Sequence, residues 1–202
     1  MKFENSETLQ CLINAFTGES QARNKYTIYA KIAKKEGYNL ISEVFLETAE
    51  NEKEHAKLFY KEIPNGFYTP NAIYPFFTGI TLENLISASK AEKDEWENIY
   101  KHGSQVAKAD GFDDISRLFF NIGEIEKRHF HRFSILAEEI KNETLYKKDE
   151  VTQWICTECG HTHIGKEAPC VCPVCGHEQE YFKLFTDKFW TKKRFLINET
   201  AS

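Results

Sequence analysis

The chain has 202 residues, of which 41% are hydrophobic and 28% charged, so it holds enough apolar material for a packed core and wholesale disorder is excluded. Its 26 Lys and Arg stand against 31 Asp and Glu, without the basic excess expected of a nucleic-acid-binding protein. No apolar run approaches the roughly 18 residues of a membrane-spanning helix, and residues 1–10 do not resemble a signal peptide. We therefore expect a cytoplasmic protein that binds neither nucleic acid nor membranes.

Apolar residues spaced three and four apart predict four long helices. These helices are expected at residues 6–35, 40–62, 82–110 and 113–141. The third is expected to be continuous and to turn Ile86, Trp96 and Ile99 toward the core. Short connections make two antiparallel hairpins, and the long connection at residues 64–80 joins them, as in ferritin-like bundles with one crossover. We therefore predict a mainly α fold with a ferritin-like four-helix bundle over residues 1–145.

Acidic side chains interrupt the apolar face of every predicted helix near its middle. They are Glu19 on the first helix, Glu52 on the second, Glu92 and Glu95 on the third, and Glu126 on the fourth. A carboxylate buried without a partner is strongly destabilising, and five of them in one core would repel one another. Bound cations would supply the missing positive charge.

Two of these acids are followed three residues later by histidine, in Glu52-x-x-His55 and Glu126-x-x-His129. Residues three apart share a helix face, so each pair can address one metal ion. One Glu from each of two helices and a Glu-x-x-His from each of the other two is the di-iron carboxylate pattern. The sequence therefore predicts a dinuclear metal site. Its candidate ligands are Glu19, Glu52, His55, Glu92, Glu95, Glu126 and His129.

Five of the six cysteines lie within residues 156–175, which favours a second metal site. Two Cys-x-x-Cys-Gly sequences supply its candidate ligands, Cys156, Cys159, Cys172 and Cys175. Four thiolates suit either zinc or a single iron, and on spacing alone a structural zinc site is the commoner. We expect a small domain over residues 151–186, after a polar linker. Cys11 and Cys170 receive no role.

Taken together, these motifs resemble those of the rubrerythrin family over about residues 5–186. The match comprises Gly18-Glu19-Ser20-Gln21-Ala22-Arg23, Glu52-Lys53-Glu54-His55-Ala56-Lys57, Glu92-x-x-Glu95, Glu126-x-x-His129, and the stretch from Trp154 to Phe182 with Ala168-Pro169. The resemblance implies two non-haem irons in the bundle and a rubredoxin-like β and knuckle domain at the C-terminal end. It also implies iron rather than zinc in the four-cysteine site, although zinc can occupy that site in purified protein.

The resemblance further implies a peroxidase that reduces hydrogen peroxide to water in defence against oxidative stress. Electrons would come from a rubredoxin or an NAD(P)H-dependent reductase through the four-cysteine iron, and the protein would be a homodimer or a larger homo-oligomer. Glu95 and His55 would exchange on one iron as its oxidation state changes. Tyr26 and Tyr100 would lie beside the site, and these four are the expected catalytic residues.

Two other functions stay open on the sequence. A ferroxidase or iron-storage protein would use the same bundle, but the extra acid on the third helix and the cysteine module argue against it. An electron carrier, or a zinc-ribbon interaction protein on a bundle scaffold, would perform no catalysis. Residues 187–202 extend past the usual end of the family and hold both apolar and basic side chains. They suggest either a docking segment for a reductase or neighbouring subunit, or an element packed on the subunit's own surface.

Overall fold

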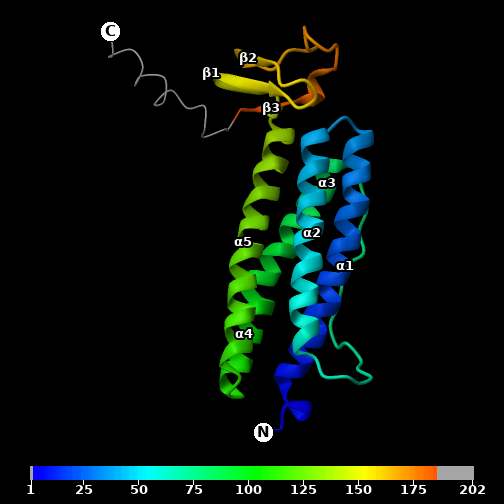
Figure 1. The fold of residues 1–202 in the computed structure, drawn as a ribbon, viewed down its shortest axis with the longest axis vertical. Helices are drawn as coiled ribbons and strands as arrows, with labels where there is room; N and C mark the ends of the chain where they lie inside the picture. Colours follow the sequence, from blue (N-terminus) through cyan, green and yellow to red (C-terminus); the bar gives the residue numbers. More distant parts are fainter. Residues whose placement is uncertain (1, 186–202) are drawn as a thin grey trace, which may run out of the picture. The chain divides into compact units, whose positions relative to one another are not determined.

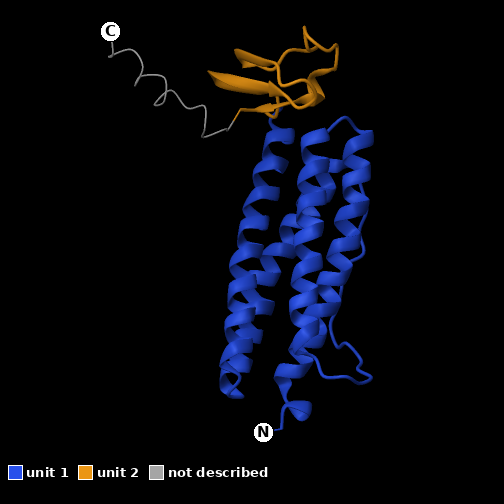
Figure 2. Ribbon diagram, viewed as in Figure 1, with its two compact units in different colours: residues 1–143 blue, residues 144–202 orange. Residues whose placement is uncertain are grey.

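The structure is a computed structural model that describes residues 2–185, and the C-terminal extension at residues 187–202 lies outside the described residues. The chain divides into two compact units, residues 1–143 and residues 144–202 (Figure 2). The first unit is helical, whereas all the strands of the described residues belong to the second. The boundary falls in the polar segment where the composition of the sequence changes.

The first unit consists of long helices packed side by side (Figure 1). After a 3-10 turn at Phe3–Asn5, its helices are α1 (Glu7–Lys35), α2 (Asn39–Glu62), α3 (Thr81–Asp94), α4 (Tyr100–Ala109) and α5 (Asp113–Lys141). α3 and α4 lie end to end and act as one helix of the bundle. The predicted ferritin-like four-helix bundle is therefore confirmed. No helix in the described part of the chain is long and apolar enough to cross a membrane.

Local interactions set the ends of these helices. The hydroxyl of Ser6 accepts a hydrogen bond from the backbone N–H of Leu9 (3.2 Å) and so caps α1. Nearby, the hydroxyl of Thr8 donates to the carboxylate of Asp110 (2.7 Å), which ties the start of α1 to the end of α4. Gly111 follows with φ of 89°, a left-handed conformation that glycine adopts without strain. The chain can therefore reverse tightly into α5.

The third helix of the bundle is not continuous, contrary to the prediction. Residues Glu95–Ile99 form a π turn, in which the N–H of Tyr100 donates to the carbonyl of Glu95. The wider turn rotates the side chains that follow it relative to a regular α-helix. Tyr100 consequently faces the core, whereas Ile99 is 44% exposed and Trp96 is only half-buried. Ile86, which lies on α3 before the turn, is exposed as well, at the edge of that helix's apolar face.

Two apolar clusters fill the core of the bundle, and on α1 the acidic Glu19 lies between their members. One cluster consists of Leu12, Ala15, Phe59, Tyr100, Ala107, Ile115, Phe119 and Ile122. The other contains the aromatic rings of Tyr26, Tyr29, Phe45 and Phe133, which contact one another with centroids 5.1 to 6.2 Å apart. Burial of these side chains stabilises the helices on both sides of the buried glutamates.

The crossover between the hairpins, residues 63–80, runs along α1 (Figure 1). Asn14 on α1 pairs with the backbone of Asn71 in both directions, accepting from its N–H (2.7 Å) and donating to its carbonyl (3.1 Å). The hydroxyls of Tyr74 and Tyr29 add bonds to the carbonyls of Asn14 and Phe77. These bonds hold an extended segment of chain against the outside of the bundle.

The second unit contains a three-stranded antiparallel sheet with strand order β2-β1-β3. Its elements are β1 (Lys147–Cys156), β2 (Thr162–Glu167), a 3-10 turn (Gln179–Tyr181) and β3 (Phe182–Leu184). Trp154 on β1 is fully buried and pairs with His163 on β2 and Leu184 on β3. Its indole N–H donates to the carbonyl of Gly165 (3.1 Å). The small core of this unit is therefore centred on Trp154 and the neighbouring cysteines.

Candidate metal centres

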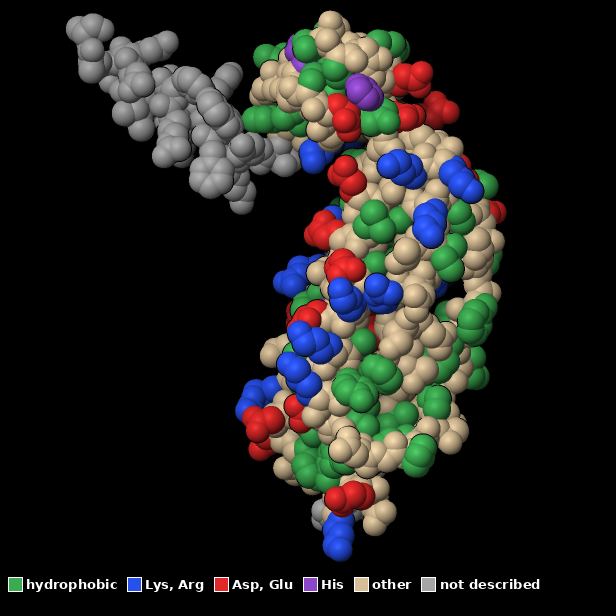
Figure 3. Space-filling model, turned by 45° about the vertical axis from the view of Figure 1, so that its right-hand side comes forward, with side chains coloured by type: hydrophobic (Ala, Val, Ile, Leu, Met, Phe, Trp, Pro, Cys, Tyr) green, Lys and Arg blue, Asp and Glu red, His purple; other side chains and the backbone are tan. Residues whose placement is uncertain are grey.

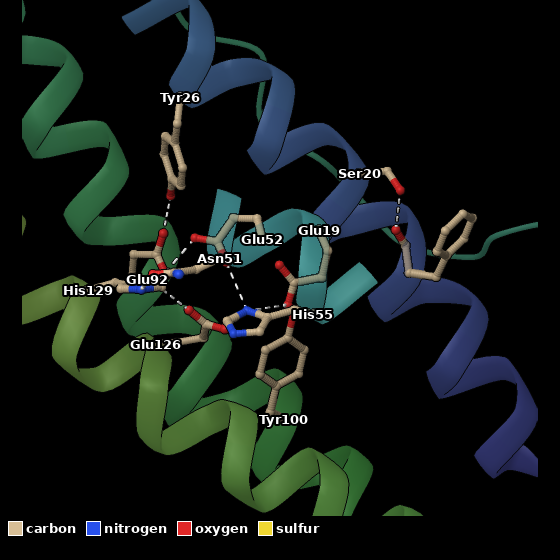
Figure 4. A network of polar contacts seen from close by, with 11 residues as sticks. Glu19, Ser20, Tyr26, Asn51, Glu52, His55, Glu92, Tyr100, Glu126 and His129 are labelled. Atoms are coloured by element: carbon tan, nitrogen blue, oxygen red, sulfur yellow. Dashed lines mark hydrogen bonds and ion pairs between the residues drawn. The ribbon is translucent and has the colours of Figure 1, made fainter. Parts of the chain in front are cut away.

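Six of the seven predicted bundle ligands meet in the core (Figure 4). They form two groups, Glu19, Glu52, His55 and Glu126, and Glu52, Glu92, Glu126 and His129, whose ligand atoms lie within 4.8 Å of one another in each group. Glu52 and Glu126 belong to both groups, and none of the six residues is more than 5% exposed. Two overlapping groups that share two carboxylates could hold a pair of metal ions.

The two histidines present the same ring nitrogen to the cluster. Nδ1 of His55 lies 2.9 Å from Oε2 of Glu52 and 2.9 Å from Oε1 of Glu126. Nδ1 of His129 lies 2.7 Å from Oε2 of Glu126 and 3.3 Å from Oε1 of Glu52. The two Glu-x-x-His motifs therefore approach the centre in a closely similar way from α2 and α5.

Many polar atoms of the cluster have no hydrogen-bond partner within the described residues. They include carboxylate oxygens of Glu19, Glu52, Glu92 and Glu126, and Nδ1 of His55, all of them fully enclosed. A buried carboxylate oxygen without a donor is costly, and native proteins rarely keep several of them together. Oxygen and imidazole donors that point at one centre fit iron ions well. The residues present therefore fit a pair of bound irons.

Electrostatics show how the cluster behaves without metal. Burial raises the pKa of Glu19 and Glu126 well above the ordinary value, and neighbouring carboxylates raise it further. Burial opposes protonation of the two histidines, but the nearby carboxylate of Glu52 raises the pKa of His55, and the carboxylates of Glu126 and Glu52 raise that of His129. In the absence of metal, bound protons therefore neutralise part of the negative charge that metal cations would otherwise compensate.

The two predicted tyrosines contact ligand carboxylates from opposite sides of the cluster (Figure 4). The hydroxyl of Tyr26 donates to Glu92, and that of Tyr100 donates to Glu19. Burial first, and these carboxylates next, raise the pKa of both phenols well above the ordinary value. Both tyrosines therefore act as neutral hydrogen-bond donors to the cluster.

The seventh predicted ligand, Glu95, lies outside both groups. It stands in the π turn and lines a groove of about 610 Å³, together with Gly18, Lys25, Tyr74 and Tyr100 among others. Burial and the charge of Glu92 raise the pKa of Glu95 well above the ordinary value, and Lys25 opposes this effect. The π turn was not predicted. The one sequence feature that pointed to a special role for Glu95 was that it is a second acid, three residues after Glu92.

The four predicted thiol ligands of the second unit also meet. They are Cys156, Cys159, Cys172 and Cys175, with sulfur atoms within 4.8 Å of one another. In each knuckle the glycine N–H, of Gly160 or Gly176, donates to the carbonyl of the first cysteine (3.0 and 2.9 Å). Both glycines have a positive φ, 75° and 76°, in the left-handed region. The donor set and its compactness fit one tetrahedrally bound metal ion.

At Cys172 the knuckle backbone also favours the thiolate form that metal binding requires. Burial raises the pKa of the Cys172 thiol, but the backbone N–H groups of Cys175 and Val174 outweigh it and lower the pKa to about 6. The other two cysteines do not belong to this group of four. Cys170 is exposed, and Cys11 is half-buried in the bundle, where burial raises its pKa to about 11.

The fold and the two sites define a class of protein: a ferritin-like bundle with a carboxylate–histidine dimetal site, followed by a tetrathiolate domain. The family model for rubrerythrin matches residues 10–137, and the model for the rubrerythrin rubredoxin-like domain matches residues 154–183. The chain belongs to the rubrerythrin family. Its cofactors are accordingly a di-iron centre in the bundle and a metal in the rubredoxin-like four-cysteine site.

Individual relatives agree with this family. The chain is 43% identical to rubrerythrin-1 of Clostridium acetobutylicum, over 91% of this chain and 97% of the relative. It is 37% identical to rubrerythrin of Nitratidesulfovibrio vulgaris, over 89% and 94%. Among solved structures it resembles nigerythrin in a mixed-valence state, with a TM-score of 0.59, 27% identity and 90% of each chain covered. A bacterioferritin of Desulfovibrio desulfuricans shares the fold, with a TM-score of 0.61 and 22% identity over 67% and 81% of the two chains.

Proposed function

We propose that this rubrerythrin-family oxidoreductase is a non-haem di-iron peroxidase of oxidative-stress defence, which reduces hydrogen peroxide, with two electrons and two protons, to two molecules of water. Two ferrous ions held by the clustered Glu and His residues would supply the two electrons, and an iron held by the four cysteines would replace them one at a time. The observation that carries this proposal is the position of Glu95. Glu95 is a carboxylate outside the cluster of six ligands, which suffices for two metal ions without it. Glu95 also lines a groove beside that cluster.

Glu95 and Tyr100 line this groove, so we take it as the approach of a small substrate to the site, and we assign roles to three side chains near the cluster. Of the seven predicted ligands only Glu95 lines the groove, so we assign its carboxyl the role of passing a proton to a departing oxygen. Tyr26 and Tyr100 keep Glu92 and Glu19 oriented by donating hydrogen bonds to them. We assign Glu95, Tyr26 and Tyr100 these roles as part of the proposal.

His55 and Glu95 would offer one metal ion two different kinds of ligand. His55 lies inside the cluster and Glu95 outside it. An imidazole suits ferrous iron, whereas an anionic oxygen favours ferric iron. We propose that these two side chains alternate as ligands, which would let the site accept both oxidation states.

The proposed partners are an electron donor and a second copy of this chain. The donor would be a rubredoxin or an NAD(P)H-dependent reductase acting on the four-cysteine iron. For the second copy, Phe67, Ile73 and Phe76 on the crossover are each at least 89% exposed, and Figure 3 shows hydrophobic side chains over this face of the bundle. Large apolar side chains exposed on one segment suit burial against another protein surface. Sedimentation equilibrium should therefore give at least twice the 23.5 kDa chain mass.

A stopped-flow experiment tests the peroxidase proposal. The reduced, iron-loaded protein is mixed with hydrogen peroxide or with oxygen, and the visible absorption of the reoxidised centres is followed. We expect peroxide to react faster than oxygen, and Glu95→Gln to slow the peroxide step by about 100-fold, because general acid–base groups contribute about 10² to 10⁴. The control is Glu97→Gln, which removes an exposed acid of the same π turn.

Each other outcome contradicts a definite part of the proposal. Faster reaction with oxygen than with peroxide would favour a ferroxidase. An unchanged peroxide rate in Glu95→Gln would remove Glu95 from the mechanism. A protein that never develops the red colour of a ferric tetrathiolate centre would exclude the proposed path of electrons.

A further inference from the structure

The two cluster histidines have similar surroundings at Nδ1, the nitrogen that faces the carboxylates. They differ at the other ring nitrogen, Nε2. Nε2 of His129 lies 3.3 Å from the side-chain oxygen Oδ1 of Asn51, which reaches it from α2 (Figure 4). The contacts of His55 with Glu19, Glu52 and Glu126 are all made through Nδ1, and within residues 2–185 no side chain is placed at its Nε2 as Asn51 is at that of His129. Only one of the two imidazoles is therefore held from both sides.

The difference can be traced to one position in the two related motifs. Asn51 directly precedes Glu52 in the motif on α2. The residue that precedes Glu126 in the motif on α5 is Ile125, whose side chain cannot accept a hydrogen bond. Both side chains are half-buried. The approximate two-fold relation between the hairpins is thus broken at the residue that would support the opposite histidine.

A hydrogen-bond acceptor beside Nε2 has a defined effect on a histidine that binds metal through Nδ1. A neutral imidazole that binds metal through Nδ1 carries its proton on Nε2, and a hydrogen bond from that N–H fixes both the tautomer and the ring orientation. The amide of Asn51 is such an acceptor and carries no charge of its own. It also connects α2 to α5, so that the ring of His129 is positioned by both hairpins.

We propose that Asn51 is a positioning residue that makes His129 the permanent histidine ligand and leaves His55 as the one that can move. The inference uses the dimetal site of the proposed function and gives it a physical reason for asymmetric ligand exchange. It requires neither peroxide as substrate nor an electron donor. Its test can therefore succeed or fail independently of the peroxidase activity.

Proton NMR of the full-length protein loaded with cobalt(II) tests the proposal, because a paramagnetic metal shifts the N–H signals of its histidine ligands away from all others. We expect one shifted, solvent-exchangeable N–H signal that is protected, from His129, and one that exchanges at least about tenfold faster, from His55. In Asn51→Ala the protected signal should exchange at the fast rate. Competition with a chelator should show cobalt affinity lowered by about 10–100-fold.

Three further variants separate positioning from a general structural effect. Asn51→Asp keeps an acceptor oxygen at the same reach and should keep the protected signal. Ile125→Asn places an acceptor at the corresponding position of α5 and should slow the exchange of the His55 signal. Asn121→Ala removes an exposed asparagine elsewhere on α5 and should change nothing. Circular dichroism checks the fold of each variant, and alanine is compatible with the helix at position 51.

The proposal is overturned if Asn51→Ala keeps the protected signal and the cobalt affinity of the unaltered chain. It is also overturned if both histidine N–H signals of the unaltered chain exchange at the same rate. If Ile125→Asn leaves the His55 signal unchanged, the residue at this position is not what distinguishes the two histidines. A protein that shows the expected signals but does not reduce peroxide would refute the proposed function alone.

Discussion

The two metal sites of this chain are built in opposite ways. In the bundle, the ligands come from helices far apart in the sequence and are enclosed between apolar clusters. In the second unit, two short knuckles supply all four sulfurs, and one of these residues, Cys159, is exposed. The bundle has a large core that does not involve its ligands, whereas Cys156 and Cys172 are themselves core residues of the second unit.

Because the two sites are built differently, their metals contribute differently to folding and to function. A small domain whose core includes the ligands depends on metal for its fold. A bundle with extensive apolar burial on both sides of its ligands can fold first, and the burial of its acids then creates the need for cations. We infer that metal acts mainly on the fold in the second unit and mainly on function in the first.

Loss of the metal from the four-cysteine site should have the largest effect. In Cys156→Ser, the folding free energy supplied by metal binding, on the order of 10 kcal/mol for structural sites of this size, is lost. We expect residues 144–185 to unfold while the bundle stays folded. Backbone amide NMR spectra should show the signals of the second unit collapse to unfolded positions. Cys170→Ser, which removes the exposed cysteine beside the knuckle, is the matched control.

A bundle that unfolds together with the second unit would contradict the comparison. So would a second unit that keeps its native spectrum in Cys156→Ser. Either result would contradict the inference that the second unit needs metal to fold whereas the bundle does not.

The metal-free bundle should lose stability as pH rises. The pKa values of Glu19, Glu126 and His55 are raised in the folded state, so the folded form binds more protons than the unfolded form above the ordinary Glu value of 4.5. Proton release then favours unfolding, and each pKa unit of displacement is worth about 1.4 kcal/mol. Glu52, whose pKa the histidines lower, acts in the opposite sense but is outnumbered.

Thermal unfolding of chelator-treated protein between about pH 5 and about pH 8 measures this effect. The transition of the bundle should fall to lower temperature with rising pH, while the iron-loaded protein shows a much smaller change. An unchanged or rising transition in the metal-free protein would show that the buried acids are not protonated as described.

The smallest effect concerns packing that is independent of metal. A Cβ added to Gly103 on α4 would lie 2.9 Å from the ring of Phe119 on α5, whereas one added to Gly123 would lie 3.5 Å from its nearest neighbour. Gly103→Ala should therefore destabilise the bundle by about 1–3 kcal/mol. Gly123→Ala, the matched control, should be neutral or slightly stabilising. Denaturant unfolding with and without iron should give the same difference, and equal effects of the two substitutions would argue against tight packing at Gly103.

The sequence by itself determined the helices, the ligand residue types and the cysteine module. This was possible because the signals are local. Helical spacing places Glu52 beside His55 on one face whatever surrounds them, and a Cys-x-x-Cys-Gly knuckle forms from consecutive residues. The buried acids were informative for a related reason, since a carboxylate on an apolar face requires a counter-charge in any compact fold.

Only the tertiary structure decided the features that depend on contacts between helices. The π turn at Glu95–Ile99 left the apolar spacing almost unchanged, so a regular helix was predicted, and Ile99 was wrongly placed in the core. The contact between Asn51 and His129 joins residues 78 positions apart, and no periodicity within either helix signals it. Local spacing identifies which residues can bind metal. The packing of one hairpin against the other decides which of them is enclosed, which lines the groove and which is held in place.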